Sequence, residues 1–567
     1  MILTEPRAGQ ATLSPFELRV AIAATTVLGL LVFIPMPRPI RPFWSLFFFG
    51  EYPWLVRLLL VLAPLALTLS LQRWLGVAVP RLADAMQAAR RATPWLMWIA
   101  SFALFWIFRE QRHWGDAGYT VDILEGVGDV GPLGRYFWKE PLDRLAAVAF
   151  TALGRHIGLD AESSVALLSS LAGSVCVVVL WSLSARLGRT GPARLVSFAL
   201  PLSAGASQLF FGHVENYTLV TLAMLLFFRE GLAVTAGEGS FVRAGLLAAL
   251  AVTTHPLAVF LIAPLVALPF LRPQPVTPRD IARFAAAMLP GILYFLVFYA
   301  LCRILGAPPL EVGVNSFGGA GRVFMDPARV FGAKHLWDVM QNYLLTLPAG
   351  AVVVLLQRFR EKPAEGRDRT ALLLAIAALS FLILALFLHG TLRRRRDWDL
   401  FAPASLPVSL LAARLLARWL DGRRASLGLG VFLVLFSLAV CGPWIASNYR
   451  YVEPARRSDS ASVERIFAAS RPDVFVSAAK GPTTDTLWPA DAGDPSRQAP
   501  TGVRRGAVDP YNLLFPTACR VAEAGSGLRP PGGLLGRPDT VALSDHRGPR
   551  GRGDGRGLPR HGHQPQP

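Results

Sequence analysis

Charged residues and cysteines are scarce in this sequence. Only 17% of its 567 residues are Asp, Glu, Lys or Arg, whereas 53% are hydrophobic and the mean hydropathy is +0.42. The composition is that of a membrane protein rather than a water-soluble domain. The four cysteines are scattered without paired spacing, which indicates neither a disulfide framework nor a metal site: Cys176, Cys302, Cys441 and Cys519.

Long apolar runs recur along the chain, each able to cross about 30 Å of hydrocarbon as a helix. The first run lacks a convincing small-residue cleavage site, so we expect it to remain as a span. Together the runs predict an all-α fold, a polytopic membrane helical bundle of about 13 transmembrane helices. We expect spans near residues 17–34, 54–72, 94–109, 160–186, 194–211, 215–229, 243–254, 256–271, 283–303, 338–357, 370–389, 399–419 and 427–446.

Lys and Arg are unevenly distributed over the loops between these runs. They fall on alternate sides of the predicted spans, which places the basic loops and the N-terminus in the cytoplasm. This bias and an Arg-rich tail account for the net charge of +19, so no nucleic-acid partner is expected. The loops expected on the external side are 110–159, 212–215, the turn at His255, 304–337, 390–398 and everything after 446.

Composition divides the chain into three parts. Residues 1–93 hold two N-terminal transmembrane helices, and residues 94–454 form the main transmembrane core, which includes the external loop 110–159. Residues 455–567 are rich in Gly, Pro and Arg, so we expect an external, low-complexity and largely disordered tail.

The first large external loop contains two segments with helical spacing. Gly115–Glu125 predicts a short amphipathic helix, and Pro141–Ile157 begins with proline and places leucines opposite arginines. The second segment is typical of a helix that lies in the membrane interface. A true crossing at this point would invert every later loop and put the positive charges outside.

Acidic residues stand beside these two predicted helices. Asp116 follows soon after a span and leads into the first helix, which carries Tyr119, while Glu140 precedes the second. A carboxylate at the membrane surface is able to accept a proton from a hydroxyl acceptor or to orient one. The structural alternative is that Asp116 caps the helix that follows it.

Further polar residues lie in short turns between spans. Turn chemistry explains Asn216, but it does not explain His213 and Glu215 together in the same turn. His255 directly precedes a helix-opening proline, where a purely structural role is the alternative. A divalent cation is conceivable if the fold brings His213, Glu215, His255 and Asp116 together, although no spacing requires it.

Four consecutive arginines and two acids lie between two apolar runs: Arg393, Arg394, Arg395, Arg396, Asp397 and Asp399. On the external side, where basic residues are usually depleted, they are hard to explain as an orientation signal. Guanidinium groups stay charged and fit phosphate oxygens, so this arginine run predicts a site for the phosphate or diphosphate of a lipid. The alternatives are a solvated basic loop and a topology that places the loop in the cytoplasm.

The order of these features resembles the GT-C superfamily of integral-membrane glycosyltransferases, which includes aminoarabinose and protein O-mannosyl transferases. The resemblance covers approximately residues 94–400: an Asp-bearing external loop, an interfacial helix opened by a Pro-Leu step, a basic cytoplasmic turn and short helices. Glu140–Leu142 stands where relatives often carry Lys-Pro-Pro-Leu, and His255 stands where a Lys is common. The resemblance implies that Asp116 acts on the acceptor and that the arginine run binds the lipid phosphate.

The resemblance implies sugar transfer from a polyprenyl-phosphate donor to a lipid, glycan or protein acceptor. The site would face the periplasm from the inner (plasma) membrane, among membrane lipids, without a nucleotide. Asp116 would be catalytic, and substrate would contact Tyr119, Glu140, His213, Glu215, His255, Asp397, Asp399 and the arginine run. Two alternatives stay open. A transporter or flippase of an anionic lipid-linked substrate predicts inverted repeats and deep polar residues, and a non-catalytic membrane scaffold would leave the external acids without a role.

Overall fold

Every regular element that the computed structural model describes is a helix, which confirms the all-α class for that part of the chain. The chain forms two compact units, Met1–Gly481 and Pro482–Pro567, and the second lies wholly outside the described residues. The predicted tail 455–567 also lies outside them, and the predicted domain boundaries stay predictions. The structure describes residues 12–33, 44–111, 117–125, 140–304, 327–360, 368–387, 398–422 and 425–450.

The most deeply buried long helices of the first unit are α7 (Ala161–Leu187), α9 (Tyr217–Thr235) and α18 (Trp398–Asp421). The shorter helix α8 (Gly191–Leu202) packs against α7 and α18. The apolar window of α18 is 83% buried, and those of α7 and α9 are 72% buried. Small residues let these helices pack closely. A Cβ atom on Gly173 of α7 would lie only 2.6 Å from Cβ of Phe210, so a larger residue does not fit there.

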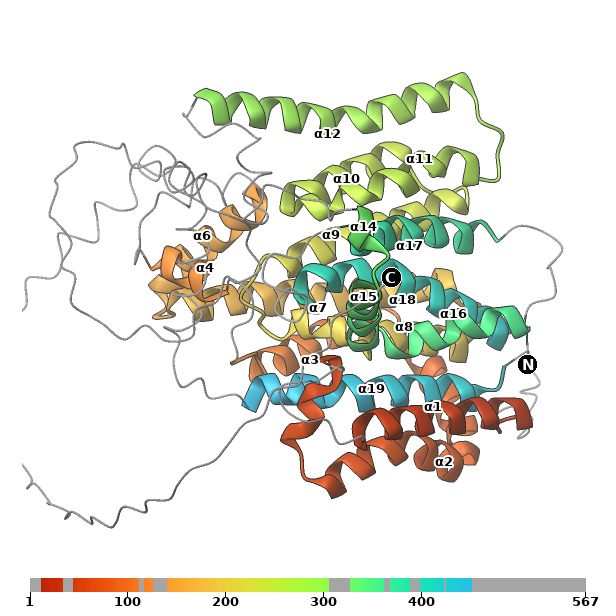
Figure 1. Cartoon of the computed structure of the whole chain (residues 1–567). Helices are drawn as coiled ribbons and strands as arrows, with labels where there is room; N and C mark the ends of the chain where they lie inside the picture. The colour runs from red at the N-terminus through yellow and green to blue at the C-terminus, as the bar shows by residue number, and fades with distance from the viewer. Residues whose placement is uncertain are drawn as a thin grey trace, which may run out of the picture. The chain divides into compact units, whose positions relative to one another are not determined.

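The N-terminal helices pack along the last described helix. They are α1 (Pro15–Phe33), the 3₁₀ helix η2 (Trp44–Glu51) and α2 (Trp54–Ala88), and the last helix is α19 (Leu427–Arg450) (Figure 1). The Tyr52 hydroxyl donates to the Pro443 carbonyl oxygen at 2.9 Å, which fixes η2 against α19. The helix α2 extends well past the predicted span at 54–72.

A second layer packs on the other side of the central helices. It consists of α10 (Phe241–Thr254), the 3₁₀ helix η4 (Pro256–Leu261) with α11 (Ile262–Leu271), α12 (Pro278–Ile304) and α17 (Arg369–Phe387). The break between α10 and η4 falls at the predicted His255-Pro256 step. Much of α12 exposes apolar side chains, which suits a face toward lipid: Ile281, Leu289, Ile292, Leu296 and Val297.

The apolar run predicted at 338–357 does not form one continuous helix. The structure has two helices there, α15 (Ala333–Thr346) and α16 (Pro348–Arg360), which meet at an angle of 106°. The physical reason is Pro348, because a proline disfavours the helical conformation of the residue before it. Leu347 accordingly has φ −159° and ψ 48°.

The predicted count of about 13 spans is not confirmed by the described residues. Seven helices are long and apolar enough to cross a membrane, or up to eight if the bent pair α15–α16 is one span. Shorter apolar helices at Thr93–Ile107, Phe241–Thr254 and Pro256–Leu271 make up part of the difference. The predicted runs therefore form helices, but several of them are too short to span alone.

Both helices predicted in the first external loop are present. They are α4 (Ala117–Leu124) and α6 (Pro141–His156), which follow α3 (Thr93–Ile107) (Figure 1). In α6, Leu145 and Leu153 are exposed, whereas Arg144 on the opposite face is buried in the protein. An outward apolar face with an inward polar face is the arrangement that an interfacial helix needs.

Loops predicted to be external contact one another. Just after α3, the backbone N–H of Glu110 donates to the Phe211 carbonyl oxygen at 2.7 Å. The backbone N–H of Gln111 donates to the Asn448 carbonyl oxygen at 3.1 Å. On the same side, His335 of α15 hydrogen-bonds through Nε2 to the Leu386 carbonyl oxygen at 2.6 Å. We call this end of the bundle the site end, because the candidate residues lie there.

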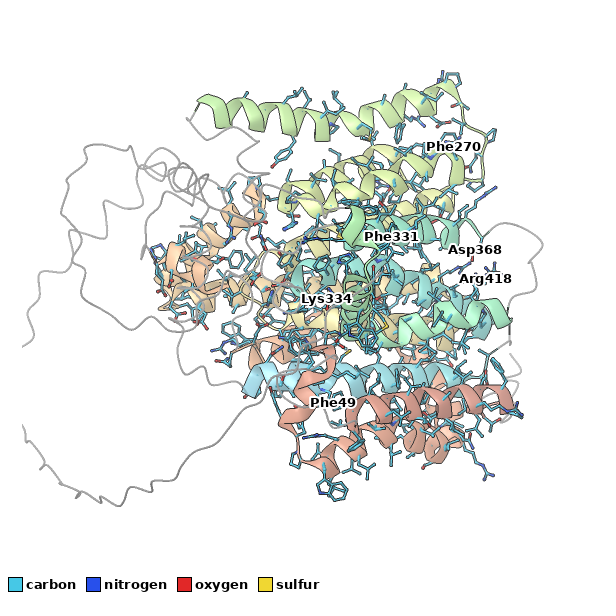
Figure 2. All side chains as sticks on the ribbon, in the orientation of Figure 1. Phe49, Phe270, Phe331, Lys334, Asp368 and Arg418 are labelled. Carbon is cyan, nitrogen blue, oxygen red and sulfur yellow. The ribbon has the colours of Figure 1, made fainter. Side chains whose placement is uncertain are left out.

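Loops predicted to be cytoplasmic meet at the opposite end of α7 and α18. Asp421 accepts from Arg189 N at 2.8 Å, and Arg414 bonds the Leu187 carbonyl oxygen at 2.6 Å. Arg418 pairs with Asp368 at 3.3 Å, as labelled in Figure 2. The predicted grouping of loops into two sides thus agrees with the contacts. Which end faces the cytoplasm stays a prediction.

Candidate functional site

The structure buries five of the predicted site residues at the site end. Three of them are His213, Glu215 and Asp399, with 0%, 7% and 1% of their surfaces exposed, and the others are Glu140 and His255, with 5% and 3% exposed. Asp116, Asp397 and the arginine run Arg393–Arg396 lie outside the described residues, as does the side chain of Tyr119.

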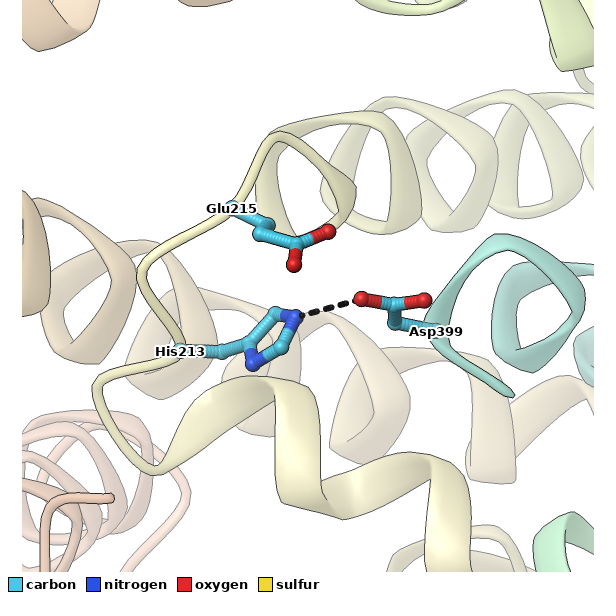
Figure 3. Close-up of side chains that lie close together, drawn as sticks. All are labelled: His213, Glu215 and Asp399. Atoms are coloured by element: carbon cyan, nitrogen blue, oxygen red, sulfur yellow. Dashed lines mark hydrogen bonds and ion pairs between the residues drawn. The ribbon is translucent and has the colours of Figure 1, made fainter. Parts of the chain in front are cut away.

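His213 is the centre of the first buried network. Its Nδ1 lies 3.0 Å from Oε2 of Glu110. Its Nε2 lies 3.3 Å from Oδ2 of Asp399, the contact drawn as a dashed line in Figure 3. The Gln208 amide also donates to Oε2 of Glu110, at 2.8 Å. The network therefore joins the end of α3, the turn before α9 and the start of α18.

Glu140 is the centre of the second buried network. Its Oε1 lies 3.0 Å from Nε2 of His255, and its Oε2 accepts from the side-chain amide of Asn216. Arg144, one turn further along α6, lies 3.7 Å from Oε2 of Glu140 and donates to the Thr120 hydroxyl of α4 at 3.0 Å. Both interfacial helices are thus tied to the turns at His255 and Asn216.

The turn from His213 to Asn216 connects the two networks. It begins after Gly212, which adopts φ +66°, a conformation that side-chain-bearing residues rarely take. A Cβ atom on Gly212 would also lie 2.8 Å from Cβ of Arg109. Tyr217 then starts α9 and packs its ring on His255, with centroids 5.1 Å apart.

The electrostatics of the first network favour a positively charged His213. Burial alone would lower the pKa of its imidazole, but the carboxylates of Glu110 and Asp399 outweigh burial and raise the pKa of His213 to about 10. Nδ1 and Nε2 then donate to one carboxylate each. Buried histidines with strongly shifted pKa values cluster at functional sites.

One group at the site has the composition of a metal site. His213, Glu215 and Asp399 offer an imidazole nitrogen and two carboxylate oxygens within 4.8 Å of one another (Figure 3). Such ligands suit Zn²⁺ or Mn²⁺, and Glu110 on Nδ1 is the orienting partner that ligand histidines have. Contrary to the predicted set, it is Asp399 and not His255 that joins His213 and Glu215. A proton on Nε2 competes with a metal ion for the same place.

Reading the sequence missed several residues of these networks. Glu110 follows directly after the predicted span at 94–109, and its position at a span end was a usable signal. Gln208 lay inside the predicted span at 194–211, which the structure replaces by α8 and the 3₁₀ helix η3 (Gly205–Phe210). Arg144 was assigned to the polar face of its helix with no partner named, and the structure shows it buried against Glu140.

No family model and no curated protein matches the chain. Among solved structures, the chain is similar to ArnT from Cupriavidus metallidurans bound to undecaprenyl phosphate, with 13% identity, a TM-score of 0.39, and coverage of 63% of this chain and 78% of that one. The apo state of the same protein gives 12% identity and a TM-score of 0.41 over the same shares. At this level of likeness we draw no functional conclusion from either structure.

Proposed function

We propose that the chain is a membrane glycosyltransferase that moves a sugar from a polyprenyl-phosphate donor to an acceptor on the external, periplasmic face. The observation that carries the proposal is the pair of buried carboxylate–imidazole networks at one end of an apolar bundle. Burying several carboxylates destabilises the fold, and a membrane scaffold would have no function that requires them. Such clusters are typical of sites that bind polar substrates or perform acid–base chemistry.

Asp116 is the proposed base, and its neighbour in the chain supports this. Ala117 is buried and belongs to one apolar cluster with Val214, the residue between His213 and Glu215. Asp116 is the next residue along the chain from Ala117, and consecutive Cα atoms lie about 3.8 Å apart. The carboxylate would take the proton of the acceptor hydroxyl.

The arginine run is the proposed site of the donor phosphate. Arg396 stands three residues before Asp399, and three residues span at most about 10 Å. Asp399 is held by His213 in the first network. This short separation in the chain supports a place for the arginine run near the first network, where the arginines would hold the phosphate while the polyprenyl tail stays in the bilayer.

The proposed reaction is a displacement at C1 of the sugar. The acceptor oxygen forms a bond to C1 of the sugar, and the bond from C1 to the phosphate oxygen breaks. Polyprenyl phosphate leaves with the electron pair, its charge stabilised by the arginines, and the acceptor proton goes to Asp116. Glu140, Glu215 and His255 would orient hydroxyl groups of the sugar or the acceptor.

A flippase is less well supported. It would need polar groups near the middle of the membrane, along the path of its substrate. The two networks instead join loops and helix ends: Asp399 is the second residue of α18, and His255 directly follows α10.

The direct test is incubation of the purified protein with polyprenyl-phosphate sugars, following the release of polyprenyl phosphate. Asp116→Asn should lose turnover by about a hundredfold or more, the usual contribution of a general base, and should still bind the lipid. The matched control is Glu238→Gln, whose side chain is 66% exposed at the opposite end. Full activity of Asp116→Asn would remove the base assignment.

The phosphate assignment has its own test. Arg394→Ala combined with Arg395→Ala should weaken the binding of polyprenyl phosphate, because two charge-assisted contacts are lost. Unchanged affinity counts against the role of the arginine run. Cysteines at positions 116 and 394 should be labelled from the same aqueous side, and labelling from opposite sides would sink the common site.

A further inference from the structure

Arg109 stands where an apolar helix reaches the site end. It is the second residue after the end of α3, and its side chain is partly exposed. The last turns of α3 expose apolar side chains, since Leu104, Ile107 and Phe108 are 47%, 59% and 42% exposed. On a membrane helix such a face contacts the hydrocarbon chains of lipids. Arg109 therefore follows directly on a lipid-facing surface, at the boundary between hydrocarbon and water.

The guanidinium of Arg109 has an aromatic partner but no acceptor within the part of the chain that the structure describes. Its Cζ atom lies over the Trp106 ring, 4.7 Å from the centroid. A cation–π contact provides no hydrogen-bond acceptor, so the N–H groups of the guanidinium remain able to donate. Arg155 of α6 differs in this respect, because its guanidinium donates to the Leu124 carbonyl oxygen at 2.8 Å.

The surroundings of Arg109 hold the side chain in place. The next residue, Glu110, donates its backbone N–H to the Phe211 carbonyl oxygen at 2.7 Å, which fixes the chain after α3. Trp106 packs against the apolar cluster that contains Val214, so the ring below the guanidinium is also held. A side chain that is already fixed loses little freedom when it binds a ligand. Arg109 thus offers a preorganised positive charge at the site end.

The chemistry of this place suits the phosphate group of a lipid. A guanidinium stays charged and presents a fork of donors that matches phosphate oxygens. The exposed apolar face of α3 beside it accommodates a hydrocarbon chain, which a free inorganic anion does not have.

We propose that Arg109 binds the phosphate of a membrane lipid whose chain lies along the exposed face of α3. Two lipids offer this chemistry, a polyprenyl phosphate and an anionic phospholipid of the surrounding membrane. The proposal goes beyond the proposed function, because the site requires neither a sugar nor an acceptor.

The test measures lipid binding to the purified protein in phosphatidylcholine nanodiscs, with bound lipid counted by native mass spectrometry. The probes are polyprenyl phosphate, phosphatidylglycerol and polyprenol, which has the chain but no phosphate. Arg109→Ala should raise the Kd for a lipid phosphate about tenfold, because charge-assisted hydrogen bonds are lost, and should leave the binding of polyprenol unchanged. Arg155→Ala is the matched control. It removes the same charge from a guanidinium that already has an acceptor, so the Kd should stay at the wild-type value.

Two further variants separate phosphate binding from a structural role of the charge. Arg109→Lys keeps a cation after the last turn of α3, where a positive charge is favourable whatever it binds, but it loses the planar fork. Its melting temperature should equal that of the wild type, while its Kd rises several-fold. Trp106→Leu removes the ring below the guanidinium and should raise the Kd about threefold. Wild-type affinity in Arg109→Ala, or equal losses in Arg109→Ala and Arg155→Ala, would overturn the site.

The outcomes also identify the ligand. The lipid whose affinity falls in Arg109→Ala is the one that the site holds, whether it is polyprenyl phosphate or phosphatidylglycerol. Inorganic phosphate that binds as tightly as these lipids would refute the lipid assignment. A wild type that transfers no sugar but binds a lipid phosphate through Arg109 would leave the site standing while the proposed function fails.

Discussion

The two ends of the bundle hold their charges in different ways. At the opposite end the pairs are formed by arginines near the surface, such as Arg186 with Glu238, whose side chains are 33% and 66% exposed. At the site end His213, His255 and Arg144 pair with buried carboxylates, and both side chains of the His213–Asp399 pair are at most 2% exposed. Water solvates the first kind of pair but not the second.

This difference separates structure from function within one fold. An exposed ion pair contributes little to the free energy of unfolding, so its presence says little about function. A buried carboxylate loses its hydration and is kept only where something compensates or requires it. The buried pairs of the site end, and not the exposed pairs of the opposite end, therefore point to function.

The largest effect should come from removing a carboxylate of the site end. Glu110→Ala leaves the Gln208 amide and Nδ1 of His213 without their acceptor. Breaking a buried ion pair in this way costs about 3–5 kcal/mol. Equilibrium unfolding in mixed micelles measures the loss. If Glu110→Ala lowered the free energy of unfolding by less than removal of a surface pair does, the contrast between the two ends would be wrong.

The second prediction is a pH dependence confined to the site end. Because the pKa of His213 is raised from 6.5 to about 10, its contribution to stability is complete below pH 6.5 and is lost as the pH rises to about 10. Arginine pairs keep their charge over this range. The melting temperature of the wild type should fall between pH 7 and 10 by more than that of His213→Gln. Equal slopes would contradict the assignment.

The helices could be predicted from the sequence more completely than the two buried networks. Apolar runs fix where helices form, and the proline at 348 was the local signal for the break that the prediction overlooked. His213 and Glu215 could be paired because they share one turn. Asp399 lies 186 residues from His213, and only the packing of α18 against the central helices decides that they meet. Arg144 is a second example, because helical spacing predicts that it lies on a polar face but does not predict which residues that face contacts.

A smaller effect is expected from Asp421 at the opposite end, whose side chain is partly exposed. The Asp421 carboxylate accepts the backbone N–H groups of Arg189 and Thr190, both at 2.8 Å, and so holds the turn between α7 and α8. Asp421→Asn keeps one acceptor oxygen and loses the other, which should cost about 1 kcal/mol. The same unfolding experiment measures it, and donor binding should not change.

The smallest effect should come from Arg186→Ala. The pair with Glu238 is short, at 2.9 Å, but both side chains are solvated. Two long side chains lose rotamer freedom to form the pair, and salt screens it, so the net contribution should stay below about 1 kcal/mol. Unfolding at low and high salt measures it against Glu110→Ala. If Arg186→Ala destabilised the protein as much as Glu110→Ala, burial would no longer distinguish the two ends, and the argument that singles out the site end would fail with it.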